Sequence, residues 1–153
     1  KDVSLEYADD VLETFDFVIA SVHSNFELAK DEMTKRIIKA IENPYTKILG
    51  HPTGRLLLQR QGYEIDMDAI LEAAAKNNVA IEINANPKRL DLDLEFHKKA
   101  KKLGIPIPIC PDAHSIEQIK YIKYGIMMAQ KSGLKKEYLL SCWDLEKVQE
   151  FFA

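Results

Sequence analysis

Strand-like apolar segments alternate with helix-like segments along almost the whole chain, and this alternation limits the folds open to it. The apolar, β-branched run at 17–22 is typical of a buried strand, and residues 25–42 follow with apolar side chains at helical spacing. The pattern repeats, with strands expected at 47–50, 79–84 and 105–110 and helices after Asp66, at 93–103 and after Ser115. Parallel strands need a crossover between them, so the pattern predicts an α/β protein with a mostly parallel sheet.

Residues that favour helix ends support these boundaries. Asp66 and Ser115 are residue types preferred at helix N-termini, because their side chains accept hydrogen bonds from free backbone N–H groups. The Asn43-Pro44 pair is expected to end the first long helix, and Gly104 suits the position just past a helix C-terminus.

The last third of the chain gives weaker signals. Two prolines restrict the strand at 105–110 to an edge or to a short pairing. Another strand is expected at 138–142, before a short helix that begins at Trp143 or Asp144. A complete eight-fold barrel takes ~250 residues. This chain of 153 residues is therefore expected to be an open doubly wound sheet or the later part of a barrel.

Charge and hydropathy exclude several classes of function. The chain has 21 basic and 24 acidic side chains, and its net charge of −3 argues against a sequence-independent grip on nucleic acid. The net charge does not exclude a phosphate substrate that is held through bound metal cations, because these ions reverse the local electrostatic field. No apolar run approaches the ~20 residues that span a bilayer, so no membrane partner is expected.

The N-terminus and the cysteines bear on the compartment. Residues 1–10 lack the basic start and apolar stretch of a secretion signal, and the first residue is not methionine. Cys110 and Cys142 show no CxxC spacing, so both are expected to be reduced thiols of a cytoplasmic protein. We expect a chain that was trimmed or excised from something longer.

Three of the four histidines fall where predicted strands end. His23, His51 and His114 follow the first, second and fourth strands, and Asp112 precedes His114 by two positions. In α/β folds, functional groups gather at these carboxyl ends. Imidazole and carboxylate groups suit zinc, manganese and iron. A single strand-end histidine is more often structural, but three together predict a shared metal site.

Other polar residues carry less specific signals. His97 falls in the middle of a predicted helix and is expected to be a surface or packing residue outside the site. Arg55 and Arg89 either bind a phosphate through the planar guanidinium or pair with an acid. Asn84, at the end of the third strand, is a further candidate for substrate contact.

Four blocks of sequence together resemble the polymerase-and-histidinol-phosphatase (PHP) domain. They span nearly the whole chain in the order of that family: VIASVHS at 18–24, GHPTGR at 50–55, EINANP at 82–87 with RLDL at 89–92, and DAHS at 112–115. They are most similar to the PHP domain at the C-terminus of bacterial and archaeal X-family DNA polymerases.

The resemblance implies a fold and a reaction. PHP domains are distorted seven-stranded, TIM-like α/β barrels that hold up to three divalent metal ions, zinc or manganese, at the strand ends. It implies that His23 and His51 bind one shared metal ion, and that Asp112 and His114 serve the other two. The implied reaction is metal-dependent hydrolysis of phosphomonoesters or phosphodiesters, and in polymerase relatives the trimming of DNA 3′ ends.

The chain also departs from the family pattern. The H-x-H block, the further histidines and the bridging glutamate of the early barrel strands are absent. Residues 1–153 are therefore expected to be the C-terminal portion of a PHP domain, a partial barrel that alone binds metal weakly and hydrolyses phosphoesters poorly. The expected partners are the N-terminal remainder of the parent protein, a phosphoester substrate and a second copy bound through an exposed sheet edge.

Two other functions stay open. The chain is alternatively a small-molecule phosphatase of the histidinol-phosphatase type, or a non-catalytic structural or partner-binding module. The EINANP and RLDL blocks favour the polymerase-associated type.

Overall fold

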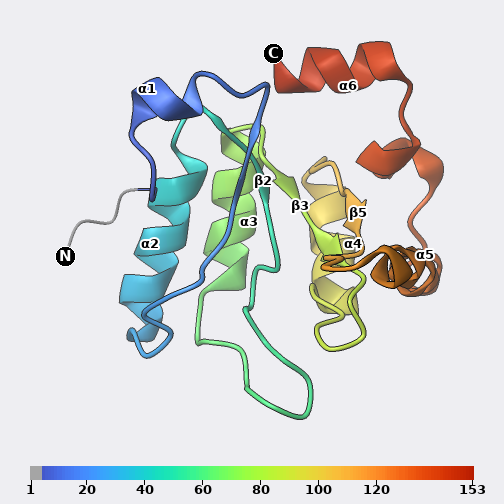
Figure 1. The fold of residues 1–153 in the computed structure, drawn as a ribbon, viewed down its shortest axis with the longest axis horizontal. Coiled ribbons are helices and arrows are strands. Elements are labelled where there is room, and N and C mark those ends of the chain that lie inside the picture. The colour runs from blue at the N-terminus through green and yellow to red at the C-terminus, as the bar shows by residue number, and fades with distance from the viewer. Residues whose placement is uncertain (1–4) are drawn as a thin grey trace.

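The computed structural model describes residues 5–153, and its strands all run parallel (Figure 1). Strands β1 (Val18–Ala20), β2 (Thr46–Leu49) and β3 (Ala80–Ile81) form a three-stranded sheet in the order β1-β2-β3. Strands β4 (Ile83–Asn84) and β5 (Ile109–Cys110) form a second, two-stranded sheet. The expected α/β class with parallel strands is confirmed.

The strand expected at 79–84 is divided between the two sheets. Its first half, β3, pairs with β2, whereas its second half, β4, pairs with β5. The backbone N–H of Glu82, at the division, still donates to Leu49 O over 3.1 Å. One continuous segment therefore joins both sheets. The strands of residues 5–153 do not close into a barrel, so the TIM-like barrel stays a prediction.

Helices pack side by side along one face of the sheets. They are α2 (Lys30–Ile41), α3 (Met67–Lys76), α4 (Leu94–Lys102) and α5 (Ile122–Lys131), and each contacts the next in chain order. Apolar side chains of this layer pack against Leu49, Ile81 and Ile83, all at most 2% exposed. Two further helices, α1 (Asp9–Leu12) and α6 (Leu145–Phe152), lie at the same end of the molecule in Figure 1.

The opposite face of the sheet is only partly covered. Ile48 and Ala80, which alternate with the residues facing the helix layer, pack against Leu140 and Phe151 near α6. The ring of Phe152 stacks on Phe17 just before β1, with ring centroids 4.1 Å apart.

Several predicted helix ends are confirmed. The Asp66 carboxylate accepts a hydrogen bond from Ala69 N over 3.1 Å, and the Asp144 carboxylate accepts one from Lys147 N over 3.0 Å. Gly104 has a φ of +72°, which glycine adopts at no steric cost after the last turn of α4. The helix expected at 25–42 begins later, at Lys30.

Two sequence expectations are wrong. Ser115 makes no capping hydrogen bond, and the chain first forms a 3-10 helix, Ile116–Tyr121, before α5. Short 3-10 helices replace the strand expected at 138–142. That segment nevertheless lies beside the sheet, because Ile107 N donates to Tyr138 O and Leu140 N donates to Ile107 O.

Gly125 lets α5 approach the second sheet closely. A Cβ atom there would lie 2.3 Å from Ile109 Cγ2 and 2.9 Å from Ala85 Cβ, so only glycine fits without movement. In the described part of the chain, every helix is too short or too polar to cross a membrane.

Candidate active site

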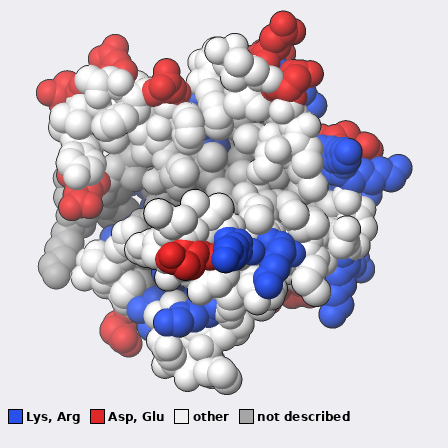
Figure 2. All heavy atoms as spheres, turned by 45° about the vertical axis from the view of Figure 1, so that its right-hand side comes forward, with Lys and Arg blue, Asp and Glu red and all other residues white. Residues whose placement is uncertain are grey.

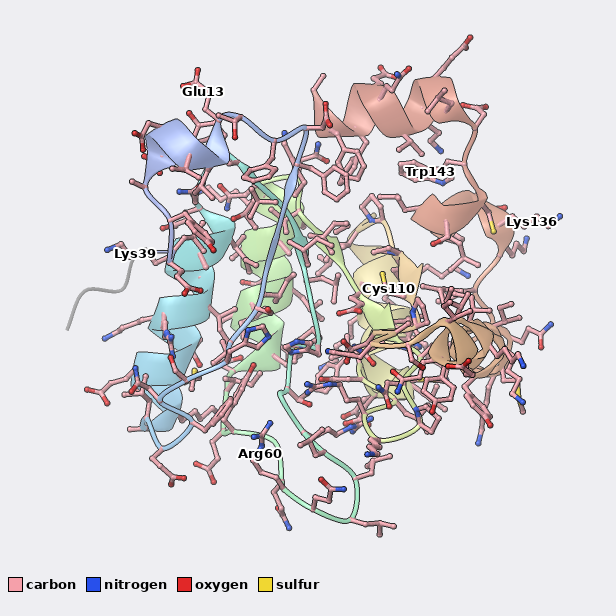
Figure 3. The ribbon with its side chains drawn as sticks, viewed as in Figure 1. Glu13, Lys39, Arg60, Cys110, Lys136 and Trp143 are labelled. Atoms are coloured by element: carbon pink, nitrogen blue, oxygen red, sulfur yellow. The ribbon has the colours of Figure 1, made fainter. Side chains whose placement is uncertain are left out.

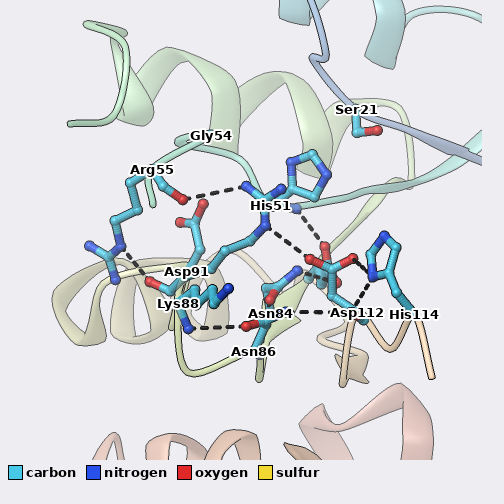
Figure 4. Close-up of polar contacts among 12 residues, drawn as sticks. Ser21, His51, Gly54, Arg55, Asn84, Asn86, Lys88, Asp91, Asp112 and His114 are labelled. Carbon is cyan, nitrogen blue, oxygen red and sulfur yellow. Dashed lines mark hydrogen bonds and ion pairs between the residues drawn. The ribbon is translucent and has the colours of Figure 1, made fainter. Parts of the chain in front are cut away.

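A cavity of about 370 Å³ opens where the parallel strands end. It is lined by Ile19, Ser21, His23, Gly50, His51, Glu82, Arg89, Cys110, Asp112 and His114. The structure thus brings together all four predicted ligands from three separate loops, as Figure 4 shows for several of them. His97 lies elsewhere, buried in α4, where its Nδ1 is hydrogen-bonded to Ser132 Oγ over 2.6 Å.

His23 and His51 face each other through equivalent nitrogen atoms. Their Nε2 atoms lie 3.2 Å apart, and Ser21 Oγ lies 3.1 Å from the same nitrogen of His23. Two nitrogens that bind one tetrahedral zinc ion at ~2.0–2.1 Å lie roughly 3.3 Å apart. The separation of the pair therefore fits a shared metal ion.

The environment of His51 keeps its imidazole neutral. The side chain is buried, and this burial, together with the neighbouring Arg89 and His23, lowers the pKa of His51 to about 4. A neutral imidazole offers a lone pair at neutral pH, which is the form that binds metals. His51 Nδ1 is buried and makes no hydrogen bond with the described residues.

Asp112 and His114 occupy the other side of the cavity. Arg89 Nε donates to Asp112 Oδ2 over 2.9 Å, and His114 Nδ1 lies 2.9 Å from Asp112 O. A carbonyl oxygen only accepts, so Nδ1 of His114 is the donor in this contact, and in the neutral imidazole this tautomer leaves the lone pair on Nε2. The His114 side chain is largely exposed, which leaves that nitrogen accessible to a ligand.

Backbone conformation singles out two of these residues. His51 has a φ of 28° and Asp112 has a φ of 50°, values that non-glycine residues seldom adopt. Strain of this kind clusters at functional sites, where surrounding contacts maintain it.

Glu82 belongs to the site, although the sequence pattern did not assign it a role there. Its Oε2 accepts from His51 N over 2.5 Å, and its Oε1 accepts from Asn84 Nδ2 over 3.2 Å. Burial outweighs the His51 hydrogen bond and raises the pKa of Glu82 to about 7. The signal that could have identified Glu82 is the alternation of side chains between the two faces of a strand. Residue 82 lies between two buried apolar neighbours, so its side chain points to the opposite face.

Gly50 leaves the room that this contact needs. A Cβ there would lie 3.1 Å from Glu82 Oε2 and 3.2 Å from Ile19 Cγ2. A side chain at position 50 would therefore push the carboxylate away from the His51 backbone.

Two residues expected to contact substrate lie outside the cavity surface. Asn84 is fully buried, and its amide holds Glu82, so its side chain positions another site residue. Arg55 donates to the carbonyl oxygens of Arg89 and Leu90 and forms an ion pair with Asp93 at 2.5 Å. Its guanidinium stabilises the loop beside the cavity, whereas Arg89 does line the cavity.

The ligand-type side chains come in pairs. Among residues 5–153, no three His, Cys, Asp or Glu side chains converge closely enough to hold one metal ion. Cys110 lies in the cavity, but burial and the neighbouring Glu82 raise its pKa to about 12, so the thiol keeps its proton.

The fold and the cavity define an α/β protein with a polar site at the carboxyl ends of its strands, as in many α/β enzymes. The chain is 43% identical over 150 residues to a Bacillus subtilis protein named DNA polymerase/3′-5′ exonuclease PolX. It is 31% identical over 157 residues to a probable phosphatase of Thermoanaerobacter sp. and 35% identical over 117 residues to one of Caldicellulosiruptor bescii. No protein-family model matches the chain.

These relatives are longer than the region they share with the chain. The matches cover 98% of the chain but 26% of the Bacillus protein, and 97% of the chain but 61% of the Thermoanaerobacter protein. The similarities agree with the resemblance to a PHP-like domain.

Proposed function

We propose that the cavity is the site of a metal-dependent phosphoesterase of the PHP type. The observation that carries this proposal is the His23–His51 pair, with Nε2 atoms 3.2 Å apart, opposite Asp112 and His114 in one cavity. A divalent metal ion bound there would polarise a phosphoryl oxygen or activate a water molecule.

The residues of the chain supply binding and orientation. The neutral imidazole of His51 holds a lone pair at neutral pH, and the exposed side chain of His114 offers a second imidazole at the cavity. Arg89 uses Nε to hold Asp112, and its guanidinium keeps further N–H groups at the cavity that suit phosphate oxygens. Glu82 holds the His51 backbone and so fixes the direction of that imidazole.

We further propose that the substrate is a phosphodiester at a DNA 3′ end. The relative with 43% identity is named a DNA polymerase/3′-5′ exonuclease, and the chain matches 26% of its length. In this proposal the chain is a part of an X-family DNA polymerase and works beside the rest of that protein.

A second candidate is a small-molecule phosphatase. This candidate is supported by the similarity to proteins named probable phosphatases. The match to one of them covers 61% of that protein's length. A non-catalytic module is the third candidate, and the four ligand-type residues gathered in one cavity weigh against it.

The test compares substrates and variants with added Mn²⁺ or Zn²⁺. The chain and a longer protein that contains it would be assayed on a chromogenic phosphodiester, a chromogenic phosphomonoester and a 3′-labelled oligonucleotide. We expect the longer protein to shorten the oligonucleotide and His51→Ala to lower its rate by at least ~100-fold. Lys98→Ala, an exposed change on α4, is the control.

The results separate the three candidates. A preference for the phosphomonoester over the oligonucleotide would favour the small-molecule phosphatase. Absence of hydrolysis by the longer protein with either metal would leave the non-catalytic module.

A further inference from the structure

A loop beside the cavity presents an exposed leucine at its tip. The segment between β2 and α3 projects farthest from the body of the molecule in Figure 1. Leu58 lies there with a fully exposed side chain and a φ of 62°. A leucine in this conformation is strained relative to glycine, and its side chain packs against nothing in the chain. Neither burial nor backbone preference accounts for a leucine at this position.

The loop is held in one shape by hydrogen bonds at its base. Leu56 N donates to Arg60 O over 2.9 Å and Arg60 N donates to Leu56 O over 2.8 Å, which closes the turn around Leu58. The Arg60 side chain, labelled in Figure 3, donates to Gly54 O and lies 4.1 Å above the ring centroid of Phe26. A tip anchored this way presents Leu58 at little entropic cost on binding.

The loop is joined directly to the wall of the cavity. Leu57 N donates to Lys88 O over 2.6 Å, and Arg89 Nη1 donates to Arg55 O over 3.4 Å. Arg89 itself lines the cavity and holds Asp112. A group bound in the cavity therefore lies next to the base of this loop.

The surroundings of the loop favour an anion. Residues 51–63 include two arginines and no acidic residue. Within the described part of the chain, Arg60 and Lys88 form no ion pair with an acid, and Lys88 is exposed. In Figure 2, lysine and arginine side chains lie near the uncharged lower tip of the molecule, with a few acidic side chains beside them. An apolar tip flanked by unpaired cations is complementary to a ligand that alternates apolar rings with phosphates.

We infer that Leu58 is a wedge that inserts against a nucleobase next to the phosphodiester in the cavity, while Lys88 and Arg60 contact the neighbouring phosphates. This inference rests on the proposed function and adds to it the residue that separates the terminal base from its stack. Apolar side chains such as leucine insert between bases in other nucleic-acid complexes and partly unstack them. A nucleobase fits better than a protein partner, because the exposed apolar surface at the tip is limited to Leu57 and Leu58 and is flanked by the cations Arg60 and Lys88.

The test measures binding and base stacking without requiring turnover. A single-stranded oligonucleotide would carry 2-aminopurine at its 3′ end, whose emission rises when the base leaves its stack. Binding would be followed by anisotropy with EDTA, and then with Zn²⁺ on an oligonucleotide with a phosphorothioate at the last linkage. Leu58→Gly removes the side chain and suits the positive φ, so folding is preserved. Leu103→Ala, at a leucine 44% exposed after α4, is the matched control.

We expect the unchanged chain and the Leu103→Ala variant to raise the emission on binding. Leu58→Gly should abolish this rise and weaken binding by about fivefold, the lower end of what one stacking side chain contributes. Lys88→Gln should weaken binding and reduce its salt dependence while the rise at saturation stays.

Three results would overturn the inference. The first is that the oligonucleotide does not bind in either condition. The second is that the Leu58→Gly variant and the unchanged chain show equal emission and equal affinity. The third is that Leu58→Gly changes only the self-association of the chain. Failure of the proposed function is detected separately, in a longer protein that contains the chain, from metal-dependent hydrolysis of a chromogenic phosphodiester too small to reach Leu58.

Discussion

The Nε2 atoms of His23 and His51 lie 3.2 Å apart although 28 positions separate the two residues in the chain. The parallel pairing of β1 with β2 produces this contact, because each histidine follows one of the two strands at the same end of the sheet. Gly50 N donates to Ala20 O over 2.9 Å and extends the pairing up to His51. The distance between the two nitrogens is thus set by sheet register.

The first prediction concerns metal affinity. A catalytic zinc site normally uses about three protein ligands, and the His23–His51 pair supplies two. We expect this chain to bind Zn²⁺ weakly and to hydrolyse phosphoesters poorly, and His51→Ala to abolish the binding that calorimetry detects. Lys98→Ala should leave it unchanged. Turnover by this chain equal to that of a longer protein that contains it, and lost in His51→Ala, would show that these ligands suffice.

The second prediction concerns Glu82 and pH. Its pKa rises from 4.5 to about 7 on folding, so between these values the folded chain binds more protons than the unfolded chain. The contribution of Glu82 to stability is therefore present below pH 4.5 and is lost as pH rises through 7. This loss amounts to about 3 kcal/mol at most.

The Glu82→Gln variant isolates this effect. His51 and His97 have pKa values lowered to about 4, so their contributions change in the opposite direction between pH 4 and 6.5. Both histidines are present in both proteins, so the difference in unfolding free energy reports Glu82. Urea unfolding with EDTA should show Glu82→Gln gaining stability relative to the unchanged chain from pH 4.5 to 7.5. A difference that stays constant with pH would contradict the raised pKa.

The third prediction concerns Gly125. Alanine normally stabilises a helix interior by up to about 1 kcal/mol relative to glycine. Here its Cβ would lie 2.3 Å from Ile109 Cγ2, and overpacking of this kind costs about 1–3 kcal/mol. Gly125→Ala should therefore destabilise the chain in urea unfolding. Adding Ile109→Ala removes the clashing methyl group, so the double variant should lose less than the sum of the single losses. Strictly additive losses would mean that α5 moves to accept the methyl group.

The fourth prediction concerns the free edge of the sheet. Strand β1 is the outer strand, and Phe17, just before it, and Ile19, within it, are 39% and 50% exposed. Exposed apolar edges pair with other chains. Light scattering should therefore show a homodimer at high protein concentration, and Ile19→Lys should favour the monomer. A strict monomer at every concentration would argue against pairing through β1.

Much of the fold was predictable because its signals are local. Asp66 and Asp144 accept hydrogen bonds from N–H groups three residues later, and Gly104 adopts a positive φ immediately after α4. The strand-end positions of His23 and His51 were predictable for the same reason. A strand and the loop that follows it are contiguous, and parallel strands end on one side of a sheet.

Contacts between distant segments decided the rest. The segment expected as one strand divides at Glu82, because its two halves pair with different neighbours. Asn84 and Arg55 were candidate substrate contacts, but their side chains hold Glu82 and the Leu90 carbonyl. The strand expected at 138–142 became 3-10 helices that bond to Ile107. Propensity and periodicity act over about four residues, whereas hydrogen bonds across the sheet join residues some 30 positions apart. The amino-acid sequence therefore determined the helices and strands, and the tertiary structure decided what each polar side chain contacts.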